Sequence, residues 1–152
     1  MDVLIREASA VDAPVIAELV TQLGYPSTVE QTADRIARWG EDPLSRVVVA
    51  TLDDRVVGVL AFHAIPFFER DGRRGRVVSL VVDEEARGHG VGARLMSFIE
   101  AEARRLGCED LELTSSRYRT GAHAFYKHLG FEDACHRSAR FVRPLSTPGD
   151  VS

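Results

Sequence analysis

The chain has 152 residues, of which 45% are hydrophobic and 28% are charged, and its formal net charge at pH 7 is −4. These values are typical of one globular domain, and the acidic balance argues against a nucleic-acid-binding surface. No apolar run is long enough to span a bilayer, no signal peptide is readable, and Cys108 and Cys135 lack metal or redox spacing. We therefore expect a cytoplasmic protein that binds neither nucleic acid nor membranes.

The first part of the chain predicts one strand followed by two helices. Residues 3–8 favour a strand, and residues 9–23 favour a helix with a proline in its first turn and Gly24 as its stop. Residues 27–30, Ser-Thr-Val-Glu, have the spacing of a capping box. The second helix is therefore expected to begin there and to end near Trp39.

The middle of the chain predicts three strands. Residues 46–52 and 56–65 are β-branched runs joined by Asp53-Asp54, which is a hairpin signal. The glycine-containing residues 71–75 predict a second turn, and the apolar residues 76–82 predict the third of these strands.

The last part of the chain predicts two helices and three strands. Residues 91–106 have helical periodicity, residues 109–115 alternate as a strand, and residues 122–129 again have an apolar helical face. Residues 131–134 and 137–142 are expected to form two short terminal strands. The apolar face of the first of these helices carries Val91, Leu95, Phe98, Ile99 and Leu106.

The resulting order is β-α-α-β-β-β-α-β-α-β-β. This order predicts an α/β (α+β) fold with one central sheet flanked by helices. No repeat or linker divides the chain, so we expect a single domain over residues 1–143 and a disordered polar tail over residues 144–152.

A glycine-rich turn between a strand and a helix is the most informative segment. Residues 87–92 read Arg-Gly-His-Gly-Val-Gly, so they offer bare backbone N–H groups, a helix N-terminus and a cation. This combination predicts a phosphate or pyrophosphate site. A P-loop is excluded because no Gly-Lys-Ser/Thr follows. A dinucleotide fingerprint fits by spacing, but five residues separate its first glycine, Gly88, from the end of the strand at Val82. A turn that only starts the helix is the third alternative.

The spacing Arg87-x-x-Gly90-x-Gly92 resembles the acyl-CoA signature, R/Q-x-x-G-x-G/A, of the GNAT N-acetyltransferase superfamily. Residues 122–131 resemble the A-x-x-x-Y-x-x-x-G-F segment of the same superfamily, in the expected order. The resemblance extends over residues 3–143 and implies a mixed, mostly antiparallel sheet. The chain departs from the pattern at Arg119, where many members carry Asn.

The resemblance implies acetyl-CoA as the acetyl-donor cosubstrate. The backbone of Leu80, Val81 and Val82 is expected to line the pantetheine arm, and the amide of Val82 is expected to polarise the thioester carbonyl. The residues implied to hold the pyrophosphate are Arg87, Gly88, His89, Gly90, Val91 and Gly92. Arg94 lies one turn further on, where it either approaches a phosphate or faces solvent.

Tyr126 stands where the superfamily often places the tyrosine that protonates the departing thiolate. The alternative role of Tyr126 is that of a core aromatic with its hydroxyl at the edge. The general base is not identified by any motif, and the candidates by chemistry are His63, Glu69, His123 and Asp83. No His or Cys spacing indicates a metal site.

The function that the resemblance implies is direct transfer of an acetyl group from acetyl-CoA to a primary amine within a ternary complex. The alternative is an acyl-CoA-binding regulatory or sensor domain without useful transfer. The sequence does not specify the acceptor, which is a small molecule or a peptide, and it leaves open whether the chain forms a homodimer. Aromatic residues that either shape the acceptor pocket or pack in the core are Tyr25, Trp39, Phe67 and Phe68.

Overall fold

The structure, a computed structural model, describes residues 2–115 and 120–145. The chain divides into two compact units, residues 1–114 and residues 115–152, and each is described by itself. The first unit contains β1 (Val3–Glu7), η1 (Ala10–Asp12), α1 (Ala13–Leu23), α2 (Val29–Glu41), β2 (Ser45–Leu52), β3 (Arg55–Pro66), β4 (Arg73–Val82), η2 (Glu84–Ala86), α3 (Val91–Arg105) and β5 (Cys108–Glu112).

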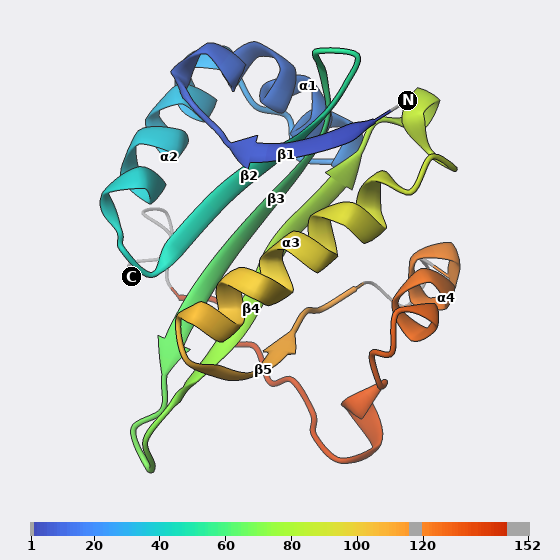
Figure 1. The fold of residues 1–152 in the computed structure, drawn as a ribbon. Helices are drawn as coiled ribbons and strands as arrows, with labels where there is room; N and C mark the ends of the chain where they lie inside the picture. The colour runs from blue at the N-terminus through green and yellow to red at the C-terminus, as the bar shows by residue number, and fades with distance from the viewer. Residues whose placement is uncertain (1, 116–119, 146–152) are drawn as a thin grey trace. The chain divides into compact units, whose positions relative to one another are not determined.

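The first unit is built on one five-stranded sheet with the order β1-β2-β3-β4-β5. The pairs from β1 to β4 are antiparallel, whereas β4 and β5 are parallel (Figure 1). The predicted α/β class with a mixed, mostly antiparallel sheet is therefore confirmed.

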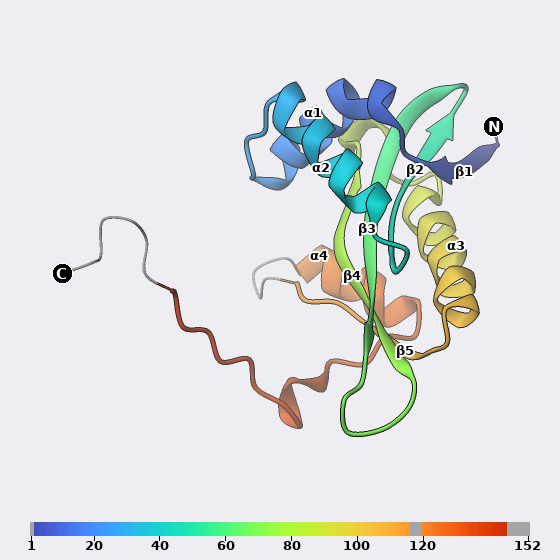
Figure 2. The same cartoon turned by 90° about the vertical axis from the view of Figure 1, so that its left-hand side faces the viewer.

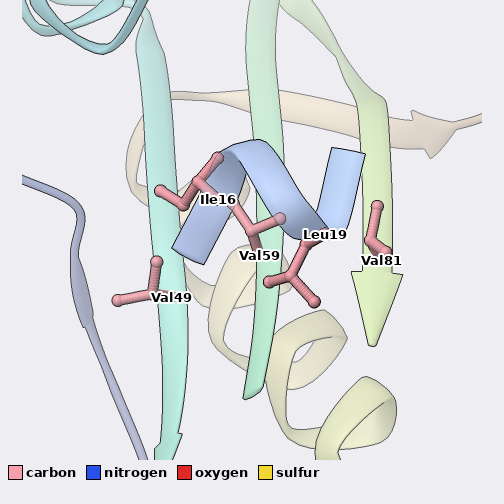
Figure 3. Close-up of a cluster of buried hydrophobic side chains, with 5 residues drawn as sticks. All are labelled: Ile16, Leu19, Val49, Val59 and Val81. Carbon is pink, nitrogen blue, oxygen red and sulfur yellow. The ribbon is translucent and has the colours of Figure 1, made fainter. Parts of the chain in front are cut away.

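Helices cover both faces of this sheet. Helices α1 and α2 lie on one face and α3 lies on the other (Figure 2). Alternate residues of a strand point to opposite faces, so β3 supplies side chains to both layers. On the α1 and α2 side, the buried cluster consists of Ile16, Leu19, Val49, Val59 and Val81 (Figure 3).

Most of the α3 residues that the sequence predicted to face the sheet are buried. Val91, Leu95 and Ile99 are buried as expected, but Phe98 and Leu106 are only half-buried. Further buried α3 residues are Met96 and Ala103. A Cβ at Gly58 of β3 would lie 3.1 Å from both the Leu95 and the Val91 side chains, so the glycine lets α3 pack closely on the sheet.

The helix starts differ from the sequence prediction in two places. The predicted helix over residues 9–23 begins with the separate 3₁₀ turn η1, because the Asp12 carboxylate accepts hydrogen bonds from the Ser9 N–H and from Arg6. The capping box is formed by Thr28 and Gln31, one residue later than predicted. Helix α2 also continues past Trp39 to Glu41.

The β2–β3 hairpin agrees with its prediction. Asp53 and Asp54 have φ values of 51° and 62°. Positive φ at both central residues is the geometry of a type I′ turn, which matches the twist of paired strands. Aspartate tolerates this left-handed region better than most residues.

The predicted turn over residues 71–75 is partly wrong, because β4 begins at Arg73. Gly75 lies inside the strand, where a Cβ would be 2.6 Å from the Phe62 ring. The start of β4 pairs with β5, and Arg74 forms two 2.8 Å hydrogen bonds with Asp110. Strand β5 spans Cys108–Glu112 rather than the predicted residues 109–115.

The second unit contains α4 (Thr120–His128) and the 3₁₀ turn η3 (Ala134–His136). Gly130, at φ 95°, ends α4, and the Phe131 N–H donates to the Tyr126 carbonyl in a Schellman arrangement. The structure does not support the strands predicted at residues 131–134 and 137–142, since no strand occurs among residues 120–145. Asp133 instead accepts a hydrogen bond from the Cys135 N–H, which turns the backbone into η3.

Candidate functional site

Strand β4 is paired on both edges over only its first residues. Its ladder with β3 runs from Arg73 to Val82, whereas its ladder with β5 joins only Arg73 to Arg76. Within the described residues, the β5-side edge of β4 is therefore without a strand partner from Val77 to Val82 (Figure 1). An open strand edge of this kind offers backbone N–H and C=O groups to a ligand.

The hydrogen bonds to β3 determine which backbone groups lie on the open edge. The Asp83 N–H donates to the Val57 carbonyl at 2.8 Å, so it points toward β3. Because N–H directions alternate along a strand, the N–H groups of Val82 and Leu80 point to the open edge, whereas that of Val81 points to β3. The side chain of Val81 is buried in the α1 and α2 layer.

The glycine turn follows this edge directly. Asp83 accepts a hydrogen bond from the Glu85 N–H and starts η2, after which Arg87 is extended. Gly88 and Gly90 have φ values of 88° and 75°, in the left-handed region that favours glycine. Apart from its chain neighbours, a Cβ on either residue would have no atom of the described residues within 4 Å. The described part of the first unit therefore leaves the space above both glycines free.

The start of α3 provides donors beside that space. The Arg94 N–H donates to the Gly90 carbonyl at 3.0 Å, which is the first hydrogen bond of the helix. The N–H groups of Val91, Gly92 and Ala93 precede it and have no acceptor within the helix. The aligned peptide dipoles of a 15-residue helix add partial positive charge at this end.

The polar side chains of the turn are all exposed. Arg87, His89 and Arg94 lie on the surface, and His89 is held by a 3.1 Å hydrogen bond between its Nδ1 atom and the Ala86 carbonyl. The cations of Arg87 and Arg94 are therefore available to an anion at the start of α3. This arrangement fits a pyrophosphate, because its oxygens accept hydrogen bonds from both backbone and guanidinium donors.

Tyr126 lies on α4 in the second unit and is half-buried. Its ring contacts Phe125, with centroids 5.4 Å apart, and Phe131, with centroids 6.1 Å apart at 71°. Two aromatic rings therefore pack against the Tyr126 ring. Arg119, at the position of the family's usual Asn, lies outside the described residues.

The four candidate bases have different environments. Glu69 is exposed in the β3–β4 loop, Asp83 caps η2, and His123 lies half-buried on α4. His63 is half-buried in β3, and its Nδ1 atom is 2.9 Å from the Ser45 hydroxyl and 3.6 Å from the Asp42 carboxylate.

His63 lines a pocket of about 420 Å³ between α2 and the sheet. Its lining residues are Arg38, Trp39, Asp42, Ser45, His63 and Val78. Sequence reasoning named Trp39 and His63 as separate candidates and did not identify Arg38, Asp42 or Ser45. The six lining residues come from α2, the α2–β2 connection, β2, β3 and β4, and only the strand register brings Ser45 opposite His63.

Among the helices of the described residues, none has the length and hydropathy that a membrane crossing requires. The two cysteines are free thiols: Cys108 is half-buried, and Cys135 is exposed. Burial raises the pKa of the Cys108 thiol above its usual value.

The sequence profile of the Acetyltransferase (GNAT) family matches residues 14–131, which include the glycine turn and Tyr126. The chain belongs to this family. It is 31% identical over 96 residues to the aminoalkylphosphonate N-acetyltransferase of Salmonella typhimurium, with 63% of this chain and 62% of the relative covered. It is 34% identical over 134 residues to the IAA acetyltransferase of Azospirillum brasilense, with 84% of this chain and 82% of the relative covered.

Solved structures share the fold at lower identity. A putative acetyltransferase from Agrobacterium tumefaciens superposes with a TM-score of 0.82 at 23% identity, covering 93% of this chain and 99% of that one. An acetyltransferase from Trypanosoma brucei superposes with a TM-score of 0.74 at 26% identity, covering 96% of this chain and 100% of that one. The arrangement of β4, the turn and α3 therefore occurs within an established fold.

Proposed function

We propose that this protein is an acetyl-CoA-dependent N-acetyltransferase that acts on a primary amine within a ternary complex. The observation that carries the proposal is the open edge of β4 leading directly into the glycine turn at the start of α3. Family membership and relatives named as N-acetyltransferases support it. The free thiols suit the reducing cytoplasm, where we expect the protein to act.

In this proposal the turn holds the pyrophosphate of acetyl-CoA. Gly88 and Gly90 let the phosphate oxygens approach the backbone, the N–H groups of Val91 and Gly92 donate to them, and Arg87 adds charge with His89 beside it. Among the described residues, only chain neighbours come within 4 Å of a Cβ at either glycine, which is the steric observation that fits this role.

The open edge of β4 then aligns the acyl arm. The N–H groups of Leu80 and Val82 donate to it, and one of them polarises the thioester carbonyl, a role that the family resemblance gives to Val82. The side chain of Val81 packs in the core behind it. A backbone donor fixed in a sheet stabilises the oxyanion without reorganising during the reaction.

Tyr126 supplies the proton for the leaving thiolate. The amine nitrogen attacks the carbonyl carbon, the carbon–sulfur bond breaks, and the sulfur takes the phenolic proton. The nitrogen loses one proton as the amide forms, and that proton restores the phenol through solvent. The amine must be neutral when it attacks. A base or a water molecule therefore has to remove a proton from its ammonium form first. Acceptors named for the relatives include aminoalkylphosphonates, which support a small primary amine as the acceptor class.

The test is release of free CoA thiol from acetyl-CoA across a panel of primary amines. The proposal expects release that depends on the added amine and saturates with acetyl-CoA. Acetyl-CoA binding without amine-dependent release from any panel member would instead indicate an acyl-CoA-binding regulatory or sensor domain. Absence of acetyl-CoA binding would reject both functions.

A further inference from the structure

The pocket beside α2 contains a histidine whose tautomer is determined by its neighbours. The Leu44 N–H and the Ser45 hydroxyl both donate to Asp42, at 2.9 Å each, and they hold the pKa of that carboxyl below its usual value. Asp42 is therefore ionised at neutral pH and can only accept hydrogen bonds.

The protonation of His63 follows from that ionisation. The single hydroxyl proton of Ser45 is donated to Asp42, so the Ser45 oxygen must accept the 2.9 Å hydrogen bond that joins it to His63. The proton of neutral His63 is then on Nδ1, and Nε2 carries the free lone pair. Among the described residues, Nε2 has no hydrogen-bond partner, and His63 lines the pocket with a side chain that is 36% exposed.

Three charged groups lie near His63. The Asp42 carboxylate is 3.6 Å from its Nδ1 atom. Two cations are also near: Arg38 lines the same pocket, and Arg76 is the cross-strand neighbour of His63 on β4. Arg76 is itself paired with Glu112 at 3.0 Å, which offsets its charge.

A β-bulge connects this pocket to the open edge of β4. The register of β3 and β4 shifts so that Ala61 opposes Ser79 and Phe62 opposes Val77, which leaves Val78 without a partner on β3. Val78 is 49% exposed and lines the pocket. The open-edge N–H of Leu80 is two residues further along, or about 7 Å, whereas that of Val82 is about 13 Å away.

We propose that this pocket receives the acceptor amine and that His63 is the general base, with Ser45 and Asp42 as its positioning residues. The inference rests on the proposed N-acetyltransferase function. The amine proton moves to Nε2 of His63, directly or through one water, and the lone pair that remains on nitrogen attacks the thioester carbon. The shorter span places the reacting carbonyl at the N–H of Leu80, with Val82 further along the acyl arm.

The experiment compares two acceptors of similar shape and different basicity. One is an alkyl amine with a pKa of ~10.4, of which about 1 molecule in 10³ is neutral at pH 7. The other is its analogue with fluorine next to the amino carbon, chosen to have a pKa below 7. His63→Gln is the main variant because glutamine can still hydrogen-bond Ser45 but cannot take a proton.

A general base predicts a loss of kcat/KM of about 10²- to 10⁴-fold in His63→Gln with the alkyl amine at pH 7. The loss should shrink as the pH rises and should nearly vanish with the fluorinated amine. The acetyl-CoA Kd should stay unchanged. Ser45→Ala should show the same pattern with a smaller loss, and the exposed His136→Ala should behave as wild type.

Two results would overturn the inference. Wild-type-like activity of folded His63→Gln would remove the base role, and an equal loss with both amines would indicate a structural role instead. If wild type released no CoA with any amine, the failure would lie in the proposed function, and the inference would fall with it. Activity in wild type with unaltered kinetics in His63→Gln would reject the inference alone.

Discussion

The two ends of α3 provide a matched test of the glycine turn. Gly90 at its start has φ 75°, and Gly107 just after its end has φ 76°. At neither position would a Cβ come within 4 Å of a described residue other than its chain neighbours. Alanine at either position therefore imposes the same left-handed strain without a steric clash, but only Gly90 lies in the proposed pyrophosphate site.

The strain sets the expected effect on stability. An L-residue in the left-handed region costs about 1–2 kcal/mol, and a domain of about 150 residues loses about 2–4 °C of Tm for each kcal/mol. Gly90→Ala and Gly107→Ala should both lower the Tm by about 2–8 °C. In the absence of ligand, the two variants should be indistinguishable.

The effect on acetyl-CoA should separate the two variants. A methyl group in a closely filled contact costs about 1–3 kcal/mol, which is about a 5- to 150-fold loss of affinity. Calorimetry should show that loss for Gly90→Ala, a larger one for Gly90→Val, and an unchanged Kd for Gly107→Ala. Equal affinities for all three folded variants would refute the assignment of the turn, and so would an equal loss in both alanine variants.

Two further predictions concern Tyr126 and Asp12. Tyr126→Phe keeps the packed ring, so we expect kcat to fall by about 10²- to 10⁴-fold with little change in acetyl-CoA Kd, and steady-state kinetics within a few-fold of wild type would contradict the acid role. Two 2.8 Å hydrogen bonds from Arg6 lower the pKa of buried Asp12, so Asp12→Asn should lose about 1–3 kcal/mol of unfolding free energy. This contribution is complete above the unfolded-state pKa of ~3.9 and is lost as pH falls through the lower folded-state pKa. Urea unfolding of wild type and Asp12→Asn measures it as a difference in unfolding free energy. If that difference does not shrink below pH 4, the ion pair is not its source.

Features fixed by neighbouring residues could be predicted from the sequence. The Asp53-Asp54 turn and the stop at Gly24 follow from local backbone preferences, and the structure contains both. The capping box shows the limit of such signals. Residues 27–30 and residues 28–31 both fit the pattern, and only the hydrogen bonds of Thr28 decide between them.

Features fixed by contacts between distant residues could not be predicted in the same way. Gly75 suggested a turn, but it pairs with Ala64 in β4, and its missing side chain leaves room for the Phe62 ring. Residues 137–142 were predicted as a short strand, yet Asp133 already directs the preceding backbone into η3. A tertiary contact outweighs the local sequence pattern in the first case, and a side-chain hydrogen bond outweighs it in the second.

The two halves of the candidate site differ in the same respect. The proposed donor half is a continuous stretch of backbone, from the open edge at Leu80 to the start of α3. Its glycine spacing, together with the family resemblance, made it readable in the sequence. The proposed acceptor half consists of side chains from α2, β2, β3 and β4, which only the strand register and the bulge at Val78 bring together. Backbone donors tolerate side-chain substitution, whereas a pocket made of side chains changes with each one. Substitutions on the α2 face should therefore change the acceptor while leaving acetyl-CoA binding intact.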